Sequence, residues 1–513
     1  MDPFLFCLAL NALVFLVQHQ LSRRRVAPAA DVTRSRKTAA SRRPELADRS
    51  AEFWLFQTQW LAVYLVIMLA DWLQGTHMYT LYKEEYGLNP GTLFAIGFTS
   101  SAVFGTFLGL YVDRYGRRLG CITFCLLEVV INVLEHYNNW YVLAVGRVLG
   151  GISTSLLFTA FESWMVSEHR KRGFPEEDIA KTFAFAQIGN GICAVLAGVL
   201  AQLSADWTGD IGPFQLAIAL TVLALVMICA LWAENYGGGN ERDHADGSGA
   251  GGSGEHLFSD AMATILRTPT IFLLGLVQSF FEGSMYTFVI LWVPTLAGLV
   301  PGGKPGELDF AAFKPGQGWV FAAMMLCISL GGQVFEGMMA VTSVEKGTAV
   351  ICLVAAAAMV VPIYSSDFFT VLGSFLVVET CIGASFGALA TVRACMPAPD
   401  CQNPSLNPKP YTLNPKHTNL PSHARAHDDT QVRSHLLPDE LQASIMNIFR
   451  VPLNILVVTG TTAGDRLPTH MSFALVVHWS VALCSLCRAG VAGGLNCRPE
   501  SRAACACYRE PKP

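Results

Sequence analysis

Long apolar segments recur along this chain, and they constrain its fold more than any other feature. A helix needs about 20 mainly apolar residues to cross the hydrocarbon core of a bilayer. Twelve segments after residue 50 meet this requirement: 53–73, 93–112, 119–135, 140–165, 181–203, 213–233, 270–294, 317–337, 347–364, 369–392, 443–461 and 470–487. They predict an all-α polytopic membrane protein with twelve core spans.

The charged residues are few and unevenly placed, which sets the orientation. Only 14% of the 513 residues are charged, whereas a soluble domain carries roughly a quarter. Cytoplasmic loops hold the excess of Lys and Arg, and placing the segment before residue 53 inside puts most of the 35 basic residues on that side. Two basic residues, Arg147 and Arg450, fall inside spans. Four fall on the outer side: Lys83, Lys304, Lys314 and Arg466.

The first 20 residues are apolar and lead into a basic segment. A cleaved signal peptide should begin with positive charge and end at a small-residue cleavage site, but Asp2 leads and Arg23–Arg25 follow. We therefore expect 1–20 to be an extra N-terminal hydrophobic helix and 21–52 to be a basic cytoplasmic segment. The basic segment is the stop-transfer flank that this topology requires, with binding to anionic lipid as the alternative.

A Gly-rich, charged segment divides the chain into two halves. Such a segment cannot build a core, so 237–268 is predicted to be a flexible cytoplasmic linker. It separates an N-terminal six-helix bundle, 53–236, from a C-terminal six-helix bundle, 269–488, and paired bundles place a binding site at their interface. Residues 398–437, rich in Pro, Asn and His, are predicted to be a disordered insertion, and 489–513 a cytoplasmic tail.

The cysteines and histidines form no metal-binding or catalytic pattern. Most of the 15 cysteines lie within spans, where they are small apolar packing residues. A metal site built from His417, His423 and His427 is the weaker alternative, because the insertion gives these residues no surrounding order. No phosphate-binding Gly loop follows a strand. We therefore expect no enzyme activity, no cofactor, no metal and no nucleic-acid partner.

The stretch GLYVDRYGRR, between the second and third spans, carries the pattern Gly-x-x-x-Asp-Arg-x-Gly-Arg-Arg. It resembles the signature loop of the major facilitator superfamily, whose fold consists of two six-helix bundles. In that superfamily the Asp and Arg residues of the loop form a clasp between helices on the cytoplasmic face. The resemblance implies that Asp113, Arg114, Gly116 and Arg117 are gating and structural groups.

A narrower resemblance rests on four long strings that lie far apart. They are LADWLQGTHMYTLY (69–82), GRVLGGISTSLLFTAFESWMVSEH (146–169), QSFFEGSMYTFVILWVPTL (278–296) and NIFRVPL (447–453). Together they resemble the eukaryotic molybdate-anion transporter family. The insertion at 398–437 and the tail beyond 487 depart from that family's pattern.

Charged residues inside spans are the candidate functional groups, because each costs a few kcal/mol to insert and is usually functional or paired. They are Asp71, Glu128, Arg147, Glu162, Glu282, Glu379 and Arg450, and Glu135 borders the third span at a position expected to be interfacial.

The two arginines are the candidate ligands of molybdate, the tetrahedral dianion that the resemblance implies as substrate. A guanidinium gives two parallel hydrogen bonds and stays charged at any relevant pH. Arg147 from the first half and Arg450 from the second are predicted to clamp the anion, with Asn447 and Asn454 on the same helical face as Arg450. The alternative is that each arginine pairs with a carboxylate and holds helices together.

A protonated carboxyl near the site would carry a proton in with the anion. Glu282, in the seventh span with Gln278 and Tyr286 one turn to either side, is the first candidate for proton coupling, and Glu379 is the second.

Two further carboxylates are expected at the ends of the pathway. Glu162 lies about 22 Å from Arg147 along one helix, so it cannot share a small ion and is expected at an inner gate, with helix pairing as the alternative. Asp71 is expected to be either an outer-mouth group or an interfacial anchor.

We therefore expect a secondary active transporter that imports molybdate by alternating access, with proton coupling, in the plasma membrane. One alternative keeps the fold but moves sulfate, another oxyanion, or an organic solute recognised by Trp72, Tyr79 and Trp292. Another is a receptor or scaffold that transports nothing.

Overall fold

The structure is a computed structural model, and it describes residue 9 and residues 43–105, 108–236, 262–267, 269–303, 307–339, 341–342, 344–394, 448–449 and 452–462. Apart from residue 9, the expected N-terminal helix 1–20 lies outside the described residues. So do the insertion 398–437, the twelfth span and the tail. Within the expected linker, 262–267 is described, and it is helical.

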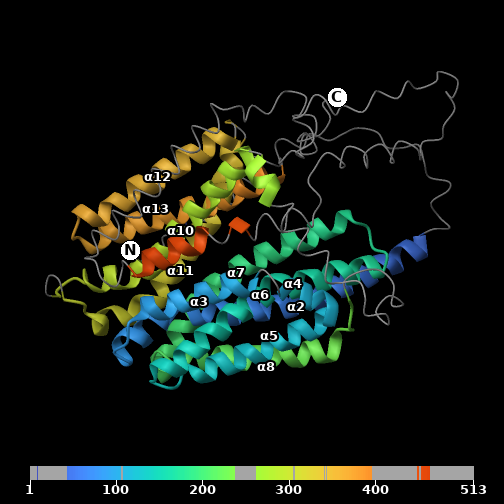
Figure 1. Ribbon diagram of the computed structural model, residues 1–513, viewed down its shortest axis with the longest axis horizontal. Helices are drawn as coiled ribbons and strands as arrows, with labels where there is room; N and C mark the ends of the chain where they lie inside the picture. Colours follow the sequence, from blue (N-terminus) through green and yellow to red (C-terminus); the bar gives the residue numbers. More distant parts are fainter. Residues whose placement is uncertain are drawn as a thin grey trace.

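The N-terminal half is a bundle of helices joined by short turns (Figure 1). Its elements are α2 (Arg43–Thr80), the π-helical turn η1 (Leu81–Glu85), α3 (Pro90–Gly105), α4 (Leu108–Tyr115), α5 (Arg117–Leu134), α6 (Trp140–Lys171), α7 (Glu177–Thr208) and α8 (Gly212–Leu231). The second predicted span corresponds to α3 and α4 together.

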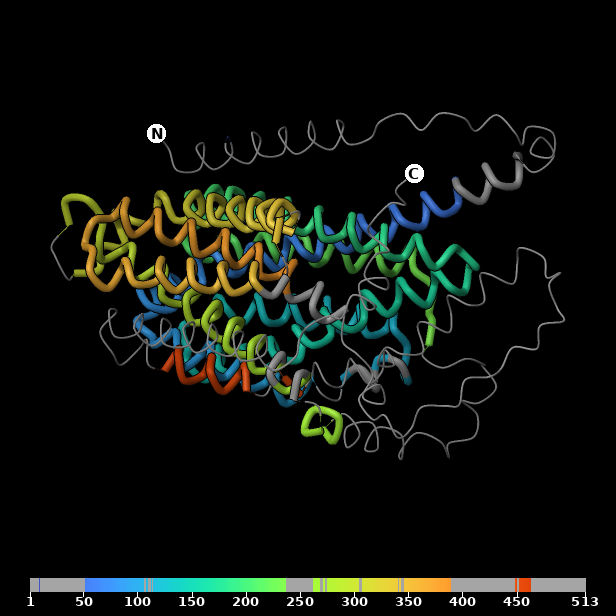
Figure 2. Tube along the Cα trace, turned by 90° about the horizontal axis from the view of Figure 1, so that it is seen from above, coloured from blue at the N-terminus to red at the C-terminus, as the bar shows by residue number. Residues whose placement is uncertain are grey.

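The C-terminal half forms a second bundle with its helices along the same long axis (Figure 2). Its helices are α10 (Pro269–Ala297), α11 (Phe310–Met339), α12 (Val344–Tyr364) and α13 (Phe368–Ala394), and 452–462 is also helical. Among the described residues, eight helices are long and apolar enough to cross a membrane. The expected all-α polytopic fold is confirmed.

The observed helices extend past the predicted spans. The first span was predicted over 53–73, whereas α2 runs from Arg43 to Thr80 and continues into η1. Hydrophobicity marks the part of a helix that suits lipid, and polar residues beyond it can continue the same helix into water or into protein.

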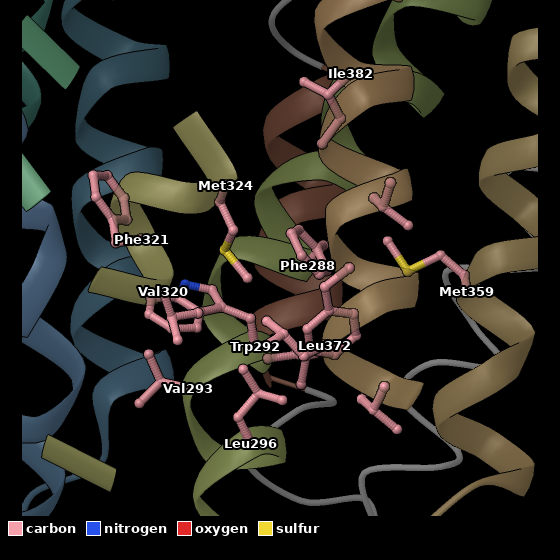
Figure 3. Packing of buried hydrophobic residues seen from close by; sticks show 14 of the residues in the cluster. Phe288, Trp292, Val293, Leu296, Val320, Phe321, Met324, Met359, Leu372 and Ile382 are labelled. Carbon is pink, nitrogen blue, oxygen red and sulfur yellow. The ribbon is translucent and has the colours of Figure 1, made fainter. Parts of the chain in front are cut away.

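Each bundle has its own aromatic core. In the N-terminal bundle the rings of Trp164 and Trp232 stack with their centroids 4.0 Å apart. In the C-terminal bundle Phe288 meets Phe375 edge to face at 5.0 Å, and Trp292 packs in the same cluster (Figure 3). These rings fix the packing of helices that are distant in sequence.

The two bundles meet where α7 lies along α11 (Figure 1). Gly198 and Gly318 face each other there, and a Cβ built on Gly198 would lie 2.8 Å from the Gly318 carbonyl oxygen. This close crossing requires glycine on both helices, because any side chain would force them apart.

Candidate functional site

Arg147 lies on α6, and its guanidinium forms an ion pair with the carboxylate of Glu135, at the end of α5. The Tyr82 hydroxyl donates to the same carboxylate at 2.9 Å. Glu135 is fully buried within the bundle, and its expected position at the membrane interface stays a prediction. The apolar run of the third span ends at this residue, but η1 and α6 cover it. The geometry matches the carboxylate-pairing alternative for Arg147.

Glu128 connects three helices of the N-terminal bundle. Its carboxylate accepts hydrogen bonds from the Gln74 amide on α2 at 2.8 Å and from the Ser153 hydroxyl on α6 at 2.6 Å. Asn132, one turn along α5, donates to the Glu128 carbonyl at 2.8 Å. Gln74 and Ser153 could not be identified as partners of Glu128 from sequence, because uncharged polar residues carry no distinct signal within an apolar span.

The helical stretch 452–462 and the nearby Phe449 pack along α10. The Ser279 hydroxyl donates to the Phe449 carbonyl at 2.9 Å, and a Cβ on Gly283 would lie 2.9 Å from the Leu456 side chain. Asn454 is half-buried on this stretch. Asn447 and Arg450 lie outside the described residues, so their predicted roles in anion binding stay predictions.

Three candidate residues share one face of α10. Gln278 donates to the Glu282 carboxylate at 2.9 Å, and Tyr286, one turn further on, meets Phe98 of α3 with ring centroids 5.0 Å apart. Since Phe98 belongs to the other bundle, this face of α10 points toward the N-terminal bundle. Gln278, Glu282 and Tyr286 therefore lie on one face of α10, and their roles in substrate binding and proton coupling stay predictions.

Glu379 is a buried carboxyl on α13, with only 4% of its surface exposed. Within the part of the chain that the structure describes, this carboxyl forms no hydrogen bond or ion pair. Its predicted role in proton coupling stays a prediction.

The remaining two carboxylates, Asp71 and Glu162, are exposed on α2 and α6. Trp72, which follows Asp71, donates its indole N–H to Asn190 on α7 at 2.9 Å and packs against Phe321 of α11. The two carboxylates thus stay available for the outer-mouth and inner-gate roles predicted for them.

The signature loop is held by a residue that follows the last helix of the same bundle. The Glu234 carboxylate, after α8, accepts the backbone N–H groups of Arg118 and Leu119 at 2.8 and 3.0 Å. Gly116 has φ 119°, and a Cβ there would lie 2.6 Å from this carboxylate. A carboxylate at a helix N-terminus satisfies free N–H groups and the helix dipole. The side chain of Asp113 lies outside the described residues, and Arg114 is exposed.

Removing this cap should destabilise α5. We expect Glu234→Ala to lower the free energy of unfolding by about 1–2 kcal/mol, because two N–H groups lose their acceptor. Thermal unfolding of the purified protein in detergent measures this, with Glu52→Ala at an exposed position as the control. Equal melting temperatures for the two variants would show that the cap contributes nothing.

Comparison with known proteins decides the family. Residues 29–387 match the model of a major facilitator family, MFS_5, described as sugar transporters with 12 transmembrane segments. The chain belongs to this major facilitator family. Membership of a transporter family confirms that the protein is not an enzyme.

Several curated relatives are similar to parts of this major facilitator protein. The molybdate-anion transporter of Xenopus tropicalis is 35% identical over 263 residues, which cover 50% of this chain and 55% of that protein. The transporter of the same name from Danio rerio is 31% identical over 326 residues, covering 59% and 63%. The chain thus spans little more than half the length of the curated relatives it matches. The resemblance identified from the four strings is confirmed.

Solved structures show the same fold at low sequence identity. The nucleoside transporter NupG aligns with a TM-score of 0.60 at 10% identity, covering 85% of this chain and 99% of that one. A bacterial homologue of the human lysosomal transporter Spinster aligns with a TM-score of 0.53 at 12% identity, covering 85% and 98%. The predicted major facilitator fold is confirmed.

Proposed function

We propose that this protein is a secondary active transporter that imports molybdate across the plasma membrane by alternating access. The observation that carries the proposal is the similarity to molybdate-anion transporters over about half of the chain. The polar face of α10, turned toward the other bundle, supports it, because major facilitator substrates bind between the bundles.

Arg450 is the principal anion ligand in this proposal. Arg147 is already paired with Glu135, which leaves its charge balanced within the N-terminal bundle. Arg450 follows Phe449 in the chain, and Phe449 packs against α10 through Ser279. This proximity in the chain supports a site shared by Arg450, Asn447 and Asn454 with the polar face of α10.

An organic solute is the less favoured cargo. Trp292 is 4% exposed and packs within the C-terminal core (Figure 3). At the interface between the bundles, Tyr79 packs against Phe310 and Trp72 packs against Phe321. The three aromatic side chains expected to recognise such a solute thus serve packing in this state.

Proton coupling would lower the electrical cost of importing a dianion. Moving one charge against the membrane potential costs about 2.3 kcal/mol per 100 mV, so each accompanying proton removes that amount. Glu379 is buried without a partner among the described residues, and Glu282 lies on the polar face of α10. Both can gain and lose a proton as their access to water alternates.

If Glu379 carries the coupling proton, Glu379→Gln should remove the dependence of uptake on outside pH. Glutamine keeps the volume and cannot titrate. Initial rates of molybdate uptake at acidic and neutral outside pH measure the effect, with Glu336→Gln at an exposed position on α11 as the control. An unchanged ratio of the two rates in Glu379→Gln would assign coupling to another group.

The proposed cargo is tested by uptake of labelled molybdate into cells that lack their own system. We expect saturable uptake that requires this protein, measured with and without a molar excess of sulfate as competitor. Uptake of sulfate but not molybdate would select the alternative oxyanion. Uptake of neither, with the protein present at the cell surface, would count against transport.

A further inference from the structure

A lysine from one bundle lies among three carboxylates of the other at the outer ends of the helices. Lys314 Nζ, in the first turns of α11, is 2.8 Å from Glu84 and 3.5 Å from Glu85, which end η1. It is 3.0 Å from Asp210, in the turn between α7 and α8. Two segments of the N-terminal bundle, η1 and the turn between α7 and α8, are thus bound to one residue of the C-terminal bundle.

The Asp210 carboxylate is the most enclosed of the three, with its side chain 3% exposed, against 32% for Glu84. Burial raises its pKa, whereas the Thr80 hydroxyl and Lys314 lower it. Its backbone N–H also donates to Glu85 at 3.3 Å. Without Lys314 this carboxylate would be left desolvated and uncompensated.

Polar and glycine contacts continue this interface one turn further into the membrane. The Gln317 side chain donates to the Thr76 carbonyl at 2.7 Å, and the Gly318 backbone N–H donates to the Gln202 side chain at 2.8 Å. The crossing of Gly198 with Gly318 lies beside these bonds. All of these contacts join one bundle to the other.

We propose that this interface is the outer gate of the transporter and that Lys314 is its latch. The proposal rests on the transport function proposed above. Opening the pathway to the outside requires α11 to move away from α2 and α7, which breaks the Lys314 pairs, both glutamine bonds and the glycine crossing together. When the bundles separate, Lys314 and the three carboxylates can hydrogen-bond to water instead, so the pairs favour the closed state without making it irreversible.

The distance between the outer ends of the two bundles tests the latch directly. Spin labels are attached to cysteines at Tyr137, after α5, and Tyr364, at the end of α12, both exposed. The native cysteines of the chain are replaced by serine. Double electron–electron resonance on the purified full chain, without substrate, then gives the ratio of separated to closed outer ends. We expect Lys314→Gln to raise this ratio about tenfold. Lys346→Gln, on an exposed position at the inner end of the same bundle, should leave it unchanged.

A second variant separates the latch from the glycine crossing. Gly318→Leu should also favour the separated state, because its Cβ would lie 2.6 Å from the Gln202 side chain. Gly316→Leu is its control, since a Cβ at Gly316 meets nothing within 4 Å. An unchanged ratio in Lys314→Gln overturns the latch, and an unchanged ratio in Gly318→Leu overturns the assignment of this interface as the gate. Neither measurement uses molybdate, so failure of the gate proposal can be distinguished from failure of the proposed cargo.

Discussion

Arg450→Lys should weaken the apparent affinity for molybdate by about ten- to a hundredfold even though it keeps the charge. A dianion that leaves water needs paired, directional donors in return. The planar guanidinium offers two parallel hydrogen bonds, whereas lysine offers one point charge on a flexible stem. Concentration-dependent uptake at matched surface expression measures the change.

Arg147→Lys is the matched control for this prediction, because it makes the same substitution in the other bundle. Arg147 pairs with Glu135, so its lysine variant should have a milder effect on apparent affinity. Near-normal affinity in Arg450→Lys would remove Arg450 from the anion site. Its better explanation would then be pairing with a carboxylate between helices.

Arg147→Met should lower the free energy of unfolding by about 3 kcal/mol or more. The substitution leaves the Glu135 carboxylate buried without its cation, although Tyr82 still donates to it. Thermal unfolding in detergent measures the loss. Arg170→Met is the control, because Arg170 pairs with Glu176 where both side chains are 58% exposed, and such pairs contribute little.

The double variant Arg147→Met, Glu135→Gln identifies the cause of that loss. It removes the unpaired charge and keeps an acceptor for Tyr82, so it should recover much of the stability lost in Arg147→Met. A double variant no more stable than the single one would show that packing of the arginine stem, and not its charge, dominates.

The positions of the spans could be predicted from sequence, because lipid imposes a length and an apolar composition on each helix. The polar face of α10 could be predicted for a similar reason, since Gln278, Glu282 and Tyr286 recur at one-turn spacing. Both signals lie within a single helix.

The pairing of groups from different helices could not be predicted. Glu135 follows an apolar run as an interfacial residue would, and only the packing of η1 and α6 over it shows that it is buried. Glu234 caps a helix more than a hundred residues earlier in the chain. From sequence Lys314 is only a basic residue on the outer side, because its carboxylate partners lie far away in the chain, two in η1 and one in the turn between α7 and α8.

The central claim is that this chain itself moves molybdate. Its most direct test is uptake of radioactive molybdate by the purified full chain in sealed proteoliposomes, with Arg450→Ala in parallel. We expect saturable accumulation inside vesicles that contain the unmodified protein, and accumulation close to that of empty vesicles for the variant. Equal accumulation in empty vesicles and in vesicles that contain the folded, unmodified protein would contradict it.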